Sequence, residues 1–302
     1  MEIILIDGNS LGWRMYHAMK LKSGEMETQA VFGFVNKIRD IRSKHQGSQI
    51  QVLWDGKAQW RFDLYPEYKS NRESDETKKR QRESYKQQRP YISRALNALG
   101  VSQLTVSTHE ADDMAGYLVA KLSADPKNFV TLMSGDHDWV QLIRANVEWR
   151  DMGDLDNVIR PRNLLDKTGF MTPFNLLEGK CLQGDSSDVI EGVGGFGEKK
   201  TPETLAEFGS VRNFWRMVDS GELTPKYKIH QRLASPEGRA AFRRNFRLMQ
   251  LLRVEKPDPS AVQLDKGAFN RERFEDVCLE LGFQSIYKTM DNYITPFIGA
   301  QK

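Results

Sequence analysis

Apolar residues in the first half of the chain form short runs separated by longer segments of helical periodicity. The runs Ile3–Ile6, Ile50–Trp54, Leu104–Ser107 and Phe129–Met133 have the length and composition of buried strands. Between them, Gln29–Lys44 repeats apolar residues at the spacing of one helix face. This alternation predicts an α/β fold in which helices flank a mostly parallel central sheet.

Acidic residues follow each of the four predicted strands. They are Asp7, Asp55, Glu110, Asp112, Asp113, Asp136 and Asp138. Because the carboxyl ends of parallel strands meet at one edge of a sheet, we expect these side chains to converge there. So many carboxylates would repel one another strongly, which predicts bound cations at that edge. After the fourth strand, Val140 and Leu142 are expected to begin a helix.

The stretch at residues 60–99 is too long for a simple crossover, and its centre is basic. An ordinary solvated helix would explain this charge, but an exposed basic insertion beside an acidic edge also suits a polyanionic substrate. Within Thr77–Arg89, Glu83 alone opposes six basic residues: Lys78, Lys79, Arg80, Arg82, Lys86 and Arg89. Aromatic rings able to stack on unpaired bases are interleaved at Tyr65, Tyr68, Tyr85 and Tyr91.

Beyond residue 150 the periodicity becomes largely helical, which predicts an α/β region at 1–160 and a helical region at 161–302. The expected helices are Pro161–Lys167, Pro173–Leu182, Pro202–Phe208, Val211–Val218, Pro236–Leu252 and Asn270–Leu281. Within this region, Asp185 and Asp188 lie three residues apart. On one helical turn they would share a face and could hold a hard cation between them.

A glycine-rich turn directly follows this acidic pair and is a candidate phosphate-binding loop. Such a turn permits positive φ and close backbone approach, and its amides can attract a phosphate oxygen. A helix C-cap followed by a solvated basic helix end is the alternative. The residues concerned are Gly192, Gly194, Gly195, Gly197, Lys199 and Lys200.

Composition narrows the chemistry further. The 302 residues include 44 basic and 41 acidic ones, so the placement of charge says more than the net +3. No apolar run approaches 18 residues and no signal peptide is recognisable, which predicts a cytoplasmic protein without a membrane partner. Cys181 and Cys278 lack metal or redox spacing and are expected to be buried thiols.

Histidines are few and no G-x-S-x-G elbow occurs, so the carboxylates remain the best candidates for chemistry. Oxygen ligands favour Mg²⁺ or Mn²⁺ over zinc, and two such ions can promote hydrolysis of a phosphodiester. Lys69 and Arg72, three residues apart, could grip the same phosphate.

Five ordered blocks of the sequence resemble the 5′-nuclease family. That family includes flap endonucleases, the 5′-3′ exonuclease domain of bacterial DNA polymerase I and bacteriophage 5′-3′ exonucleases. The blocks are residues 5–10 (LIDGNS), 54–72 (WD and WRFDLYPEYKSNR), 110–113 (EADD), 134–142 (SGDHDWVQL) and 184–201 (GDSSDVIEGVGGFGEKKT). The resemblance implies a PIN-like fold with a helical arch at about 60–99 and a helix-hairpin-helix at about 184–208.

The resemblance also implies roles for individual residues. One Mg²⁺ would be held by Asp7, Asp55, Glu110 and Asp112, and a second by Asp113, Asp136, Asp138, Asp185 and Asp188. Mn²⁺ could substitute, and K⁺ could bind at the helix-hairpin-helix. The basic pair at the scissile phosphate would be Lys69 and Arg72. DNA contacts would come from Arg61, Tyr68, Lys78, Lys79, Arg80, Arg82, Lys86, Gly192, Gly194, Gly195, Gly197, Lys199 and Lys200.

The function implied is that of a monomeric, structure-specific 5′ nuclease in primer removal and repair. Its substrates would be DNA flaps, nicks and 5′ ends, and RNA–DNA hybrids. The alternatives are a PIN-like ribonuclease and a non-catalytic junction-binding protein. A PIN-like ribonuclease usually lacks the long insertion, and a junction-binding protein would not need nine acidic residues of the kind that bind metal ions. The chain departs from the family at Val189, where Asn is frequent, at Glu191, where Pro is usual, and at Lys200-Thr201, in place of Thr-Ala.

Overall fold

A seven-stranded sheet forms the centre of the molecule. The structure is a computed structural model that describes residues 1–73 and 76–299, without the side chains of residues 72 and 73. The strands follow the order β11-β5-β4-β1-β6-β7-β8. Five are parallel, and β8 and β11 are antiparallel at the two edges. Their bounds are β1 (Glu2–Asp7), β4 (Gln49–Trp54), β5 (Ser102–Val106), β6 (Phe129–Ser134), β7 (Val147–Asp151), β8 (Val158–Ile159) and β11 (Val262–Asp265). The predicted α/β architecture is confirmed.

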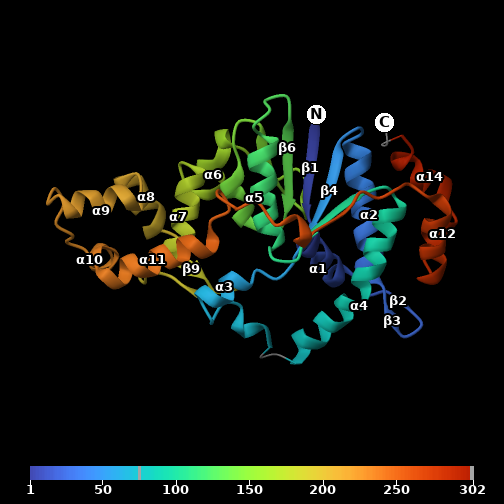
Figure 1. Ribbon diagram of the computed structural model, residues 1–302, viewed down its shortest axis with the longest axis horizontal. Helices are drawn as coiled ribbons and strands as arrows, with labels where there is room; N and C mark the ends of the chain where they lie inside the picture. The colour runs from blue at the N-terminus through green and yellow to red at the C-terminus, as the bar shows by residue number, and fades with distance from the viewer. Residues whose placement is uncertain (74–75, 300–302) are drawn as a thin grey trace.

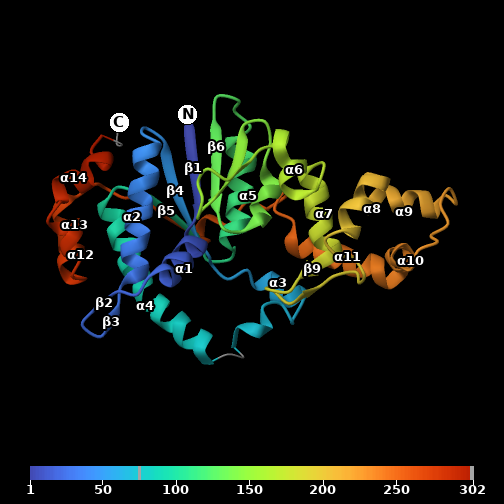
Figure 2. The ribbon, with the colours of Figure 1, turned by 180° about the vertical axis from the view of Figure 1, so that it is seen from behind.

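Helices cover both faces of the sheet (Figures 1 and 2). Successive residues of β1 point to opposite faces, so Ile4 and Ile6 pack in one core and Leu5 in another. The first core contains α1 (Gly8–Ala18), α2 (Gln29–Lys44), α4 (Glu76–Ala98) and α12 (Arg271–Glu280), and the second contains α5 (Ala111–Leu122) and α6 (Leu164–Thr168). Burial on both faces explains why the parallel strands read as continuous apolar runs.

The segment after β6 differs from the prediction. His137–Leu142 is a 3₁₀ helix, and it leads into β7 instead of an α-helix. The strand was hidden in the sequence by Glu148, the second residue of β7, which has only 1% of its surface exposed. Arg150 and Arg160 each place a side-chain nitrogen 2.6 Å from its carboxylate. A charged residue that is neutralised in the interior breaks the apolar pattern by which a strand is recognised.

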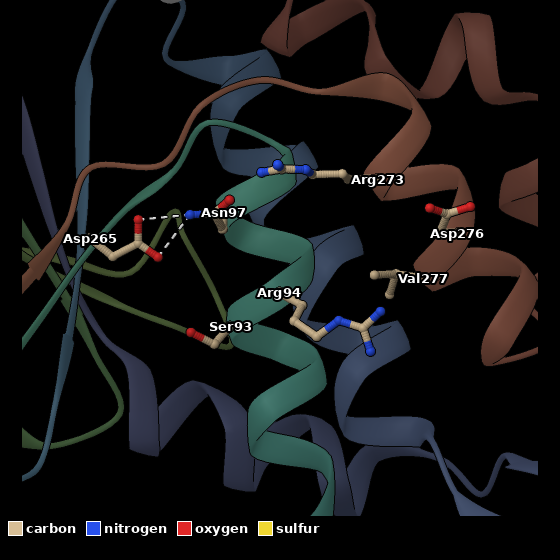
Figure 3. A pocket seen from close by; sticks show the side chains of 7 residues that line it. All are labelled: Ser93, Arg94, Asn97, Asp265, Arg273, Asp276 and Val277. Atoms are coloured by element: carbon tan, nitrogen blue, oxygen red, sulfur yellow. Dashed lines mark hydrogen bonds between the residues drawn. The ribbon is translucent and has the colours of Figure 1, made fainter.

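The C-terminal residues return to the sheet. β11 pairs with β5, and α12 packs beside α4, with a pocket of about 440 Å³ between the two helices. Figure 3 shows this pocket and the amide of Asn97, which donates to both carboxylate oxygens of Asp265 at 2.8 and 2.9 Å. The predicted division of the chain into two regions at residue 160 stays a prediction. Any such division must place these C-terminal residues with the sheet.

A helical lobe with its own apolar core extends to one side of the sheet (Figures 1 and 2). Its helices are α7 (Pro173–Gln183), α8 (Lys200–Phe208), α9 (Val211–Asp219), α10 (Lys228–Ala234) and α11 (Pro236–Met249). The two-stranded pair β9 (Gly184–Asp185) and β10 (Ile190–Glu191) links α7 to α8, as a helix-hairpin-helix requires. We call residues 184–199 the glycine hairpin. Across the described ranges, no helix has the length and apolar character needed to cross a membrane.

One buried acid in this lobe predicts how stability changes with pH. Glu178 is 2% exposed, accepts a hydrogen bond from the Val211 amide at 3.0 Å, and has its pKa raised by burial to about 7. Between pH 4.5 and 7 the folded state therefore binds a proton that the unfolded chain has released, so stability should fall as pH rises through this range. Glu178→Gln should remove that slope and gain about 2 kcal/mol at pH 8.

Urea unfolding from pH 4.5 to 8.5 would measure this effect. Glu203→Gln is the control, because Glu203 lies on the surface in a pair with Lys200 at 2.9 Å. Equal slopes for the wild type and Glu178→Gln would contradict the assignment.

Candidate active site

The acids that follow the strands line one cavity of about 450 Å³ at the carboxyl edge of the sheet. Asn9, Ser10, Trp13, Lys69, Arg82, Tyr85 and Ser187 complete its lining. We call it the acidic cavity, and six of the nine predicted metal ligands line it: Asp7, Asp55, Glu110, Asp112, Asp136 and Asp188. The convergence expected from strand order is therefore observed for five of the seven acids that follow the strands, and Asp188 joins them from the glycine hairpin.

Asp7 is positioned by the junction between β1 and α1. As the N-cap of α1, its carboxylate accepts from the Ser10 amide at 2.9 Å, and it also accepts from the Ser134 hydroxyl at 2.8 Å. Burial, followed by the charge of Asp55, raises the pKa of Asp7 to about 7. The hydrogen bonds oppose this shift but do not offset it. The hydrogen bonds thus fix the position of the Asp7 carboxylate, but they do not neutralise its negative charge.

Asp55 is held from two sides. One carboxylate oxygen accepts from the Ala111 amide at the start of α5, at 2.8 Å. The other accepts a short hydrogen bond from the side-chain amide of Asn9. Asn9 was missed as a site residue, although its place directly after Asp7-Gly8 could have revealed it.

The acidic cavity lacks enough positive charge for its carboxylates. Burial, followed by the charge of Asp136, raises the pKa of Asp112 well above its usual value, although the Trp139 indole donates to Asp112 at 2.6 Å. Among the described residues, no three acidic, histidine or cysteine side chains come close enough to enclose a metal ion unaided. A site of spaced carboxylates fits Mg²⁺, which keeps several of its own water molecules between itself and the protein.

Lys69 lies within the acidic cavity, as predicted for a phosphate-binding lysine. Its amino group is 2.7 Å from one carboxylate oxygen of Glu110 and 3.7 Å from Asp188. Its backbone has φ +57°, a left-handed conformation that is uncommon outside glycine. Tyr68 donates to the other oxygen of Glu110 at 3.0 Å and is 3% exposed, so its predicted contact with DNA is corrected to an internal one. The side chain of Arg72 lies outside the described residues.

Arg61 and Asp113 form a buried ion pair instead of contacting DNA and metal. Both residues are 3% exposed, and the two terminal nitrogens of Arg61 donate to the two oxygens of Asp113, each at 2.7 Å. Asp113 also accepts from the Glu110 amide at 3.0 Å, which caps α5. The resemblance to the 5′-nuclease family implied contacts with DNA and metal for these residues, but a bidentate pair makes their burial possible.

Asp138 and Asp185 lie outside the lining of the acidic cavity. Lys180 of α7 makes a close ion pair with Asp138 and lies 3.9 Å from Asp136. Asp185 accepts from the amide and hydroxyl of Ser187 at 2.8 and 2.6 Å. Their role as metal ligands stays a prediction. Lys180 was missed, because a single lysine in a helix gives no signal in the sequence.

Most of the predicted basic insertion is helix α4, whose first residues, 76–80, are exposed and whose later turns pack in the first core. Arg82 reaches the acidic cavity, and Arg80 lies in a groove between α4 and the strands β2 (Lys22–Ser23) and β3 (Met26–Glu27). Lys79 lies 3.8 Å from Glu76, Lys86 lies 3.4 Å from Glu83, and Lys78 is exposed. These five are the predicted arch contacts.

Two of the four tyrosines proposed for base stacking are buried. Tyr68 and Tyr85 are 3% and 7% exposed, and the Tyr85 hydroxyl has no hydrogen-bond partner among the described residues. Tyr85 packs against Gly12, where any side chain would collide with its ring. Stacking on unpaired bases by these two residues is therefore excluded in this arrangement.

The glycine hairpin uses its glycines for different purposes. Gly194 and Gly195 have φ of +91° and +84°, whereas Gly192 and Gly197 do not adopt positive φ. A side chain at Gly192 would come within 2.3 Å of a backbone oxygen, so glycine is needed there for close packing. Gly197 faces open space, and Lys199 is exposed, while Lys200 pairs with Glu203 at 2.9 Å.

Val189 predicts a stabilising substitution within this hairpin. Its φ of +59° places a β-branched residue in the left-handed region, which costs about 1–2 kcal/mol. Asn tolerates that region better, so Val189→Asn should raise the free energy of unfolding by about 1 kcal/mol. Thermal unfolding would measure it, with the exposed Val262→Asn in β11 as the control that should bring no gain. A loss of stability at residue 189 would show that packing by valine outweighs backbone strain.

Comparison with known proteins identifies the family of this chain. The family described as "5'-3' exonuclease, N-terminal resolvase-like domain" matches residues 2–169, so the chain belongs to this family. The prediction of a 5′-nuclease family is thereby confirmed. DNA polymerase I of Bacillus subtilis is 30% identical over 296 residues, which cover 96% of this chain and 32% of that protein. DNA polymerase I of Lactococcus lactis subsp. lactis is 28% identical, covering 93% of this chain and 32% of that protein. The chain thus spans about a third of the length of these curated relatives.

Solved structures share the fold over the whole chain. The T5 D15 protein co-crystallised with metal ions has a TM-score of 0.69 at 23% identity, with complete coverage of both chains. The catalytic core of Rad2 in complex with DNA substrate has a TM-score of 0.57 at 15% identity, covering 98% of this chain and 91% of that one. At these identities the likeness establishes the fold.

Proposed function

We propose that this protein is a structure-specific 5′ nuclease, acting as a 5′-3′ exonuclease and flap endonuclease near single-strand/duplex junctions. The observation that carries the proposal is the acidic cavity, whose lining brings together six carboxylates and Lys69 at the carboxyl edge of the sheet. Membership of the 5′-3′ exonuclease family supports the same reaction.

Two Mg²⁺ ions would complete the site, and Mn²⁺ could replace them. When bound, they would polarise the phosphodiester and activate water. Asp7, Asp55, Glu110 and Asp112 would hold one ion, and Asp136 and Asp188, with Asp138 and Asp185 farther out, would serve the other. Lys69, now shared between Glu110 and Asp188, would neutralise charge on the scissile phosphate once the ions occupy those carboxylates. Arg72 would act beside it.

DNA with a 5′ flap, nick or free 5′ end would be the principal substrate, with RNA–DNA hybrids as a further class. The glycine hairpin with Lys199 and Lys200 would hold the duplex backbone without reading its sequence. The basic residues of α4, with Arg82 nearest the cavity, would guide the 5′ strand. A T5 D15 flap endonuclease variant, solved as a pseudo-enzyme-product complex with DNA and metal ions, shares the fold and supports this assignment. We expect a monomer that works in the cytoplasm, or in a host's cytoplasm if viral, in primer removal and repair.

A labelled 5′-flap substrate tests the proposal. We expect cleavage near the junction with Mg²⁺ and none with EDTA. Equal product under both conditions, or no product with Mg²⁺, would overturn it. Preferential cleavage of RNA hairpins would favour the PIN-like ribonuclease, and metal-independent binding without cleavage would favour a junction-binding protein.

A further inference from the structure

Helix α10 packs directly on the glycine hairpin. The atom nearest to the position that a Cβ of Gly194 would take is a terminal nitrogen of Arg232, at 2.5 Å. A methyl carbon of Ile229 lies 2.9 Å from the equivalent position of Gly195. Because these two glycines lack side chains, they allow α10 to pack closely on the hairpin, in addition to adopting positive φ. As a result, a guanidinium group lies against the turn.

The guanidinium of Arg232 has unused hydrogen-bond donors. It is exposed, and among the described residues no acceptor is found for it. Two other arginines of the lobe are paired with carboxylates: Arg239 with Asp219 at 2.6 Å and Arg216 with Glu222 at 2.9 Å. Arg244 donates to the carbonyl of Glu191 at 2.9 Å, so it stabilises β10 within the hairpin.

The turn next to Arg232 also presents unused donors. In the described structure, the backbone amides of residues 194–199 have no backbone acceptor. Open space borders Gly197, so an incoming phosphate would meet no side chain there. A guanidinium binds phosphate through two parallel hydrogen bonds, which a lysine cannot reproduce.

We propose that Arg232 is a DNA-binding residue, which together with the amides of the turn binds one phosphate of the duplex backbone. The inference rests on the proposed function, because it assumes that duplex DNA lies on the glycine hairpin. Nothing in the sequence indicates Arg232, since it lies more than 30 residues from the turn on a short helix.

The test measures the affinity of the full chain for a labelled flap duplex by fluorescence anisotropy, in Ca²⁺ to prevent cleavage. At 0.1 M salt, Arg232→Gln should weaken binding about tenfold and reduce the slope of log K against log[salt] by about 1. Arg232→Lys should retain the slope but recover only part of the affinity.

Arg216→Gln is the matched control, because Arg216 is exposed in the same lobe but paired with Glu222. It should leave affinity and slope unchanged, and circular dichroism should show that all variants are folded. Unchanged affinity and slope in Arg232→Gln would overturn the inference even if the enzyme cleaves flaps. Weaker binding by Arg232→Gln in a protein that never cleaves would support the inference and reject the nuclease.

Discussion

Asp136→Ala should eliminate cleavage of a 5′ flap while leaving the affinity for that flap unchanged. Asp136 lines the acidic cavity, and its side chain is 47% exposed, so it is available to a metal ion. Losing one carboxylate from a site that must bind divalent cations should slow the chemical step by at least about 10³-fold. The duplex would still be held by the glycine hairpin and α4, which are separate from Asp136.

Stability provides an independent readout for the same variant. Asp136 is the second largest cause of the raised pKa of Asp112, so removing it relieves repulsion inside the cavity. Within the described structure, its side chain loses one hydrogen bond, from the Asp138 amide at 2.8 Å, and a long ion pair with Lys180 at 3.9 Å. The midpoint of thermal unfolding should therefore stay constant or rise, and a lower midpoint would attribute the loss of activity to misfolding.

Single-turnover cleavage and anisotropy measure the two halves of this prediction. Asp156→Ala is the control, because Asp156 lies in the loop between β7 and β8, away from the lining of the acidic cavity. It should cleave at the wild-type rate. Loss of binding together with cleavage in Asp136→Ala would contradict the role assigned to Asp136.

The convergence of the acids was predictable because it follows from strand order alone. β1, β4, β5 and β6 are neighbours in a parallel sheet, so whatever follows them must meet at one edge. What the sequence could not provide was the direction of each side chain. Asp112 and Asp113 are adjacent on α5, yet the first faces the acidic cavity and the second faces Arg61. Consecutive helix positions point about 100° apart, so one of such a pair is expected to miss the site.

Elements that form through contacts between residues distant in the sequence also could not be predicted from local sequence patterns. β11 is short, its residues Val262 and Leu264 are exposed, and it exists because β5 offers a free edge. Arg232 reaches the glycine hairpin only because α10 folds back over it. Both depend on tertiary packing, which overrides local propensity for short segments.

Arg61→Met should cost about 3–5 kcal/mol of stability, because it leaves the carboxylate of Asp113 buried without its partner. The loss extends beyond the pair, since Arg61 also donates to the Leu248 carbonyl at 3.1 Å and so joins α3 (Gln59–Leu64) to α11. Affinity for DNA per folded molecule should not change, because Arg61 is 3% exposed. Urea unfolding and anisotropy at low temperature would measure the two quantities separately.

Two further variants decide between a structural and a DNA-binding role. Arg61→Met combined with Asp113→Leu should recover much of the lost stability, because no unpaired charge is then buried. Arg94→Met is the matched control: Arg94 pairs with Glu280 at 2.9 Å on the surface, where such a pair is worth about 0–1 kcal/mol. If Arg61→Met instead kept full stability and bound DNA more weakly, Arg61 would belong to the DNA-binding surface after all. The expected result would show that a basic residue within the family's own sequence block stabilises the junction between the acidic cavity and the helical lobe.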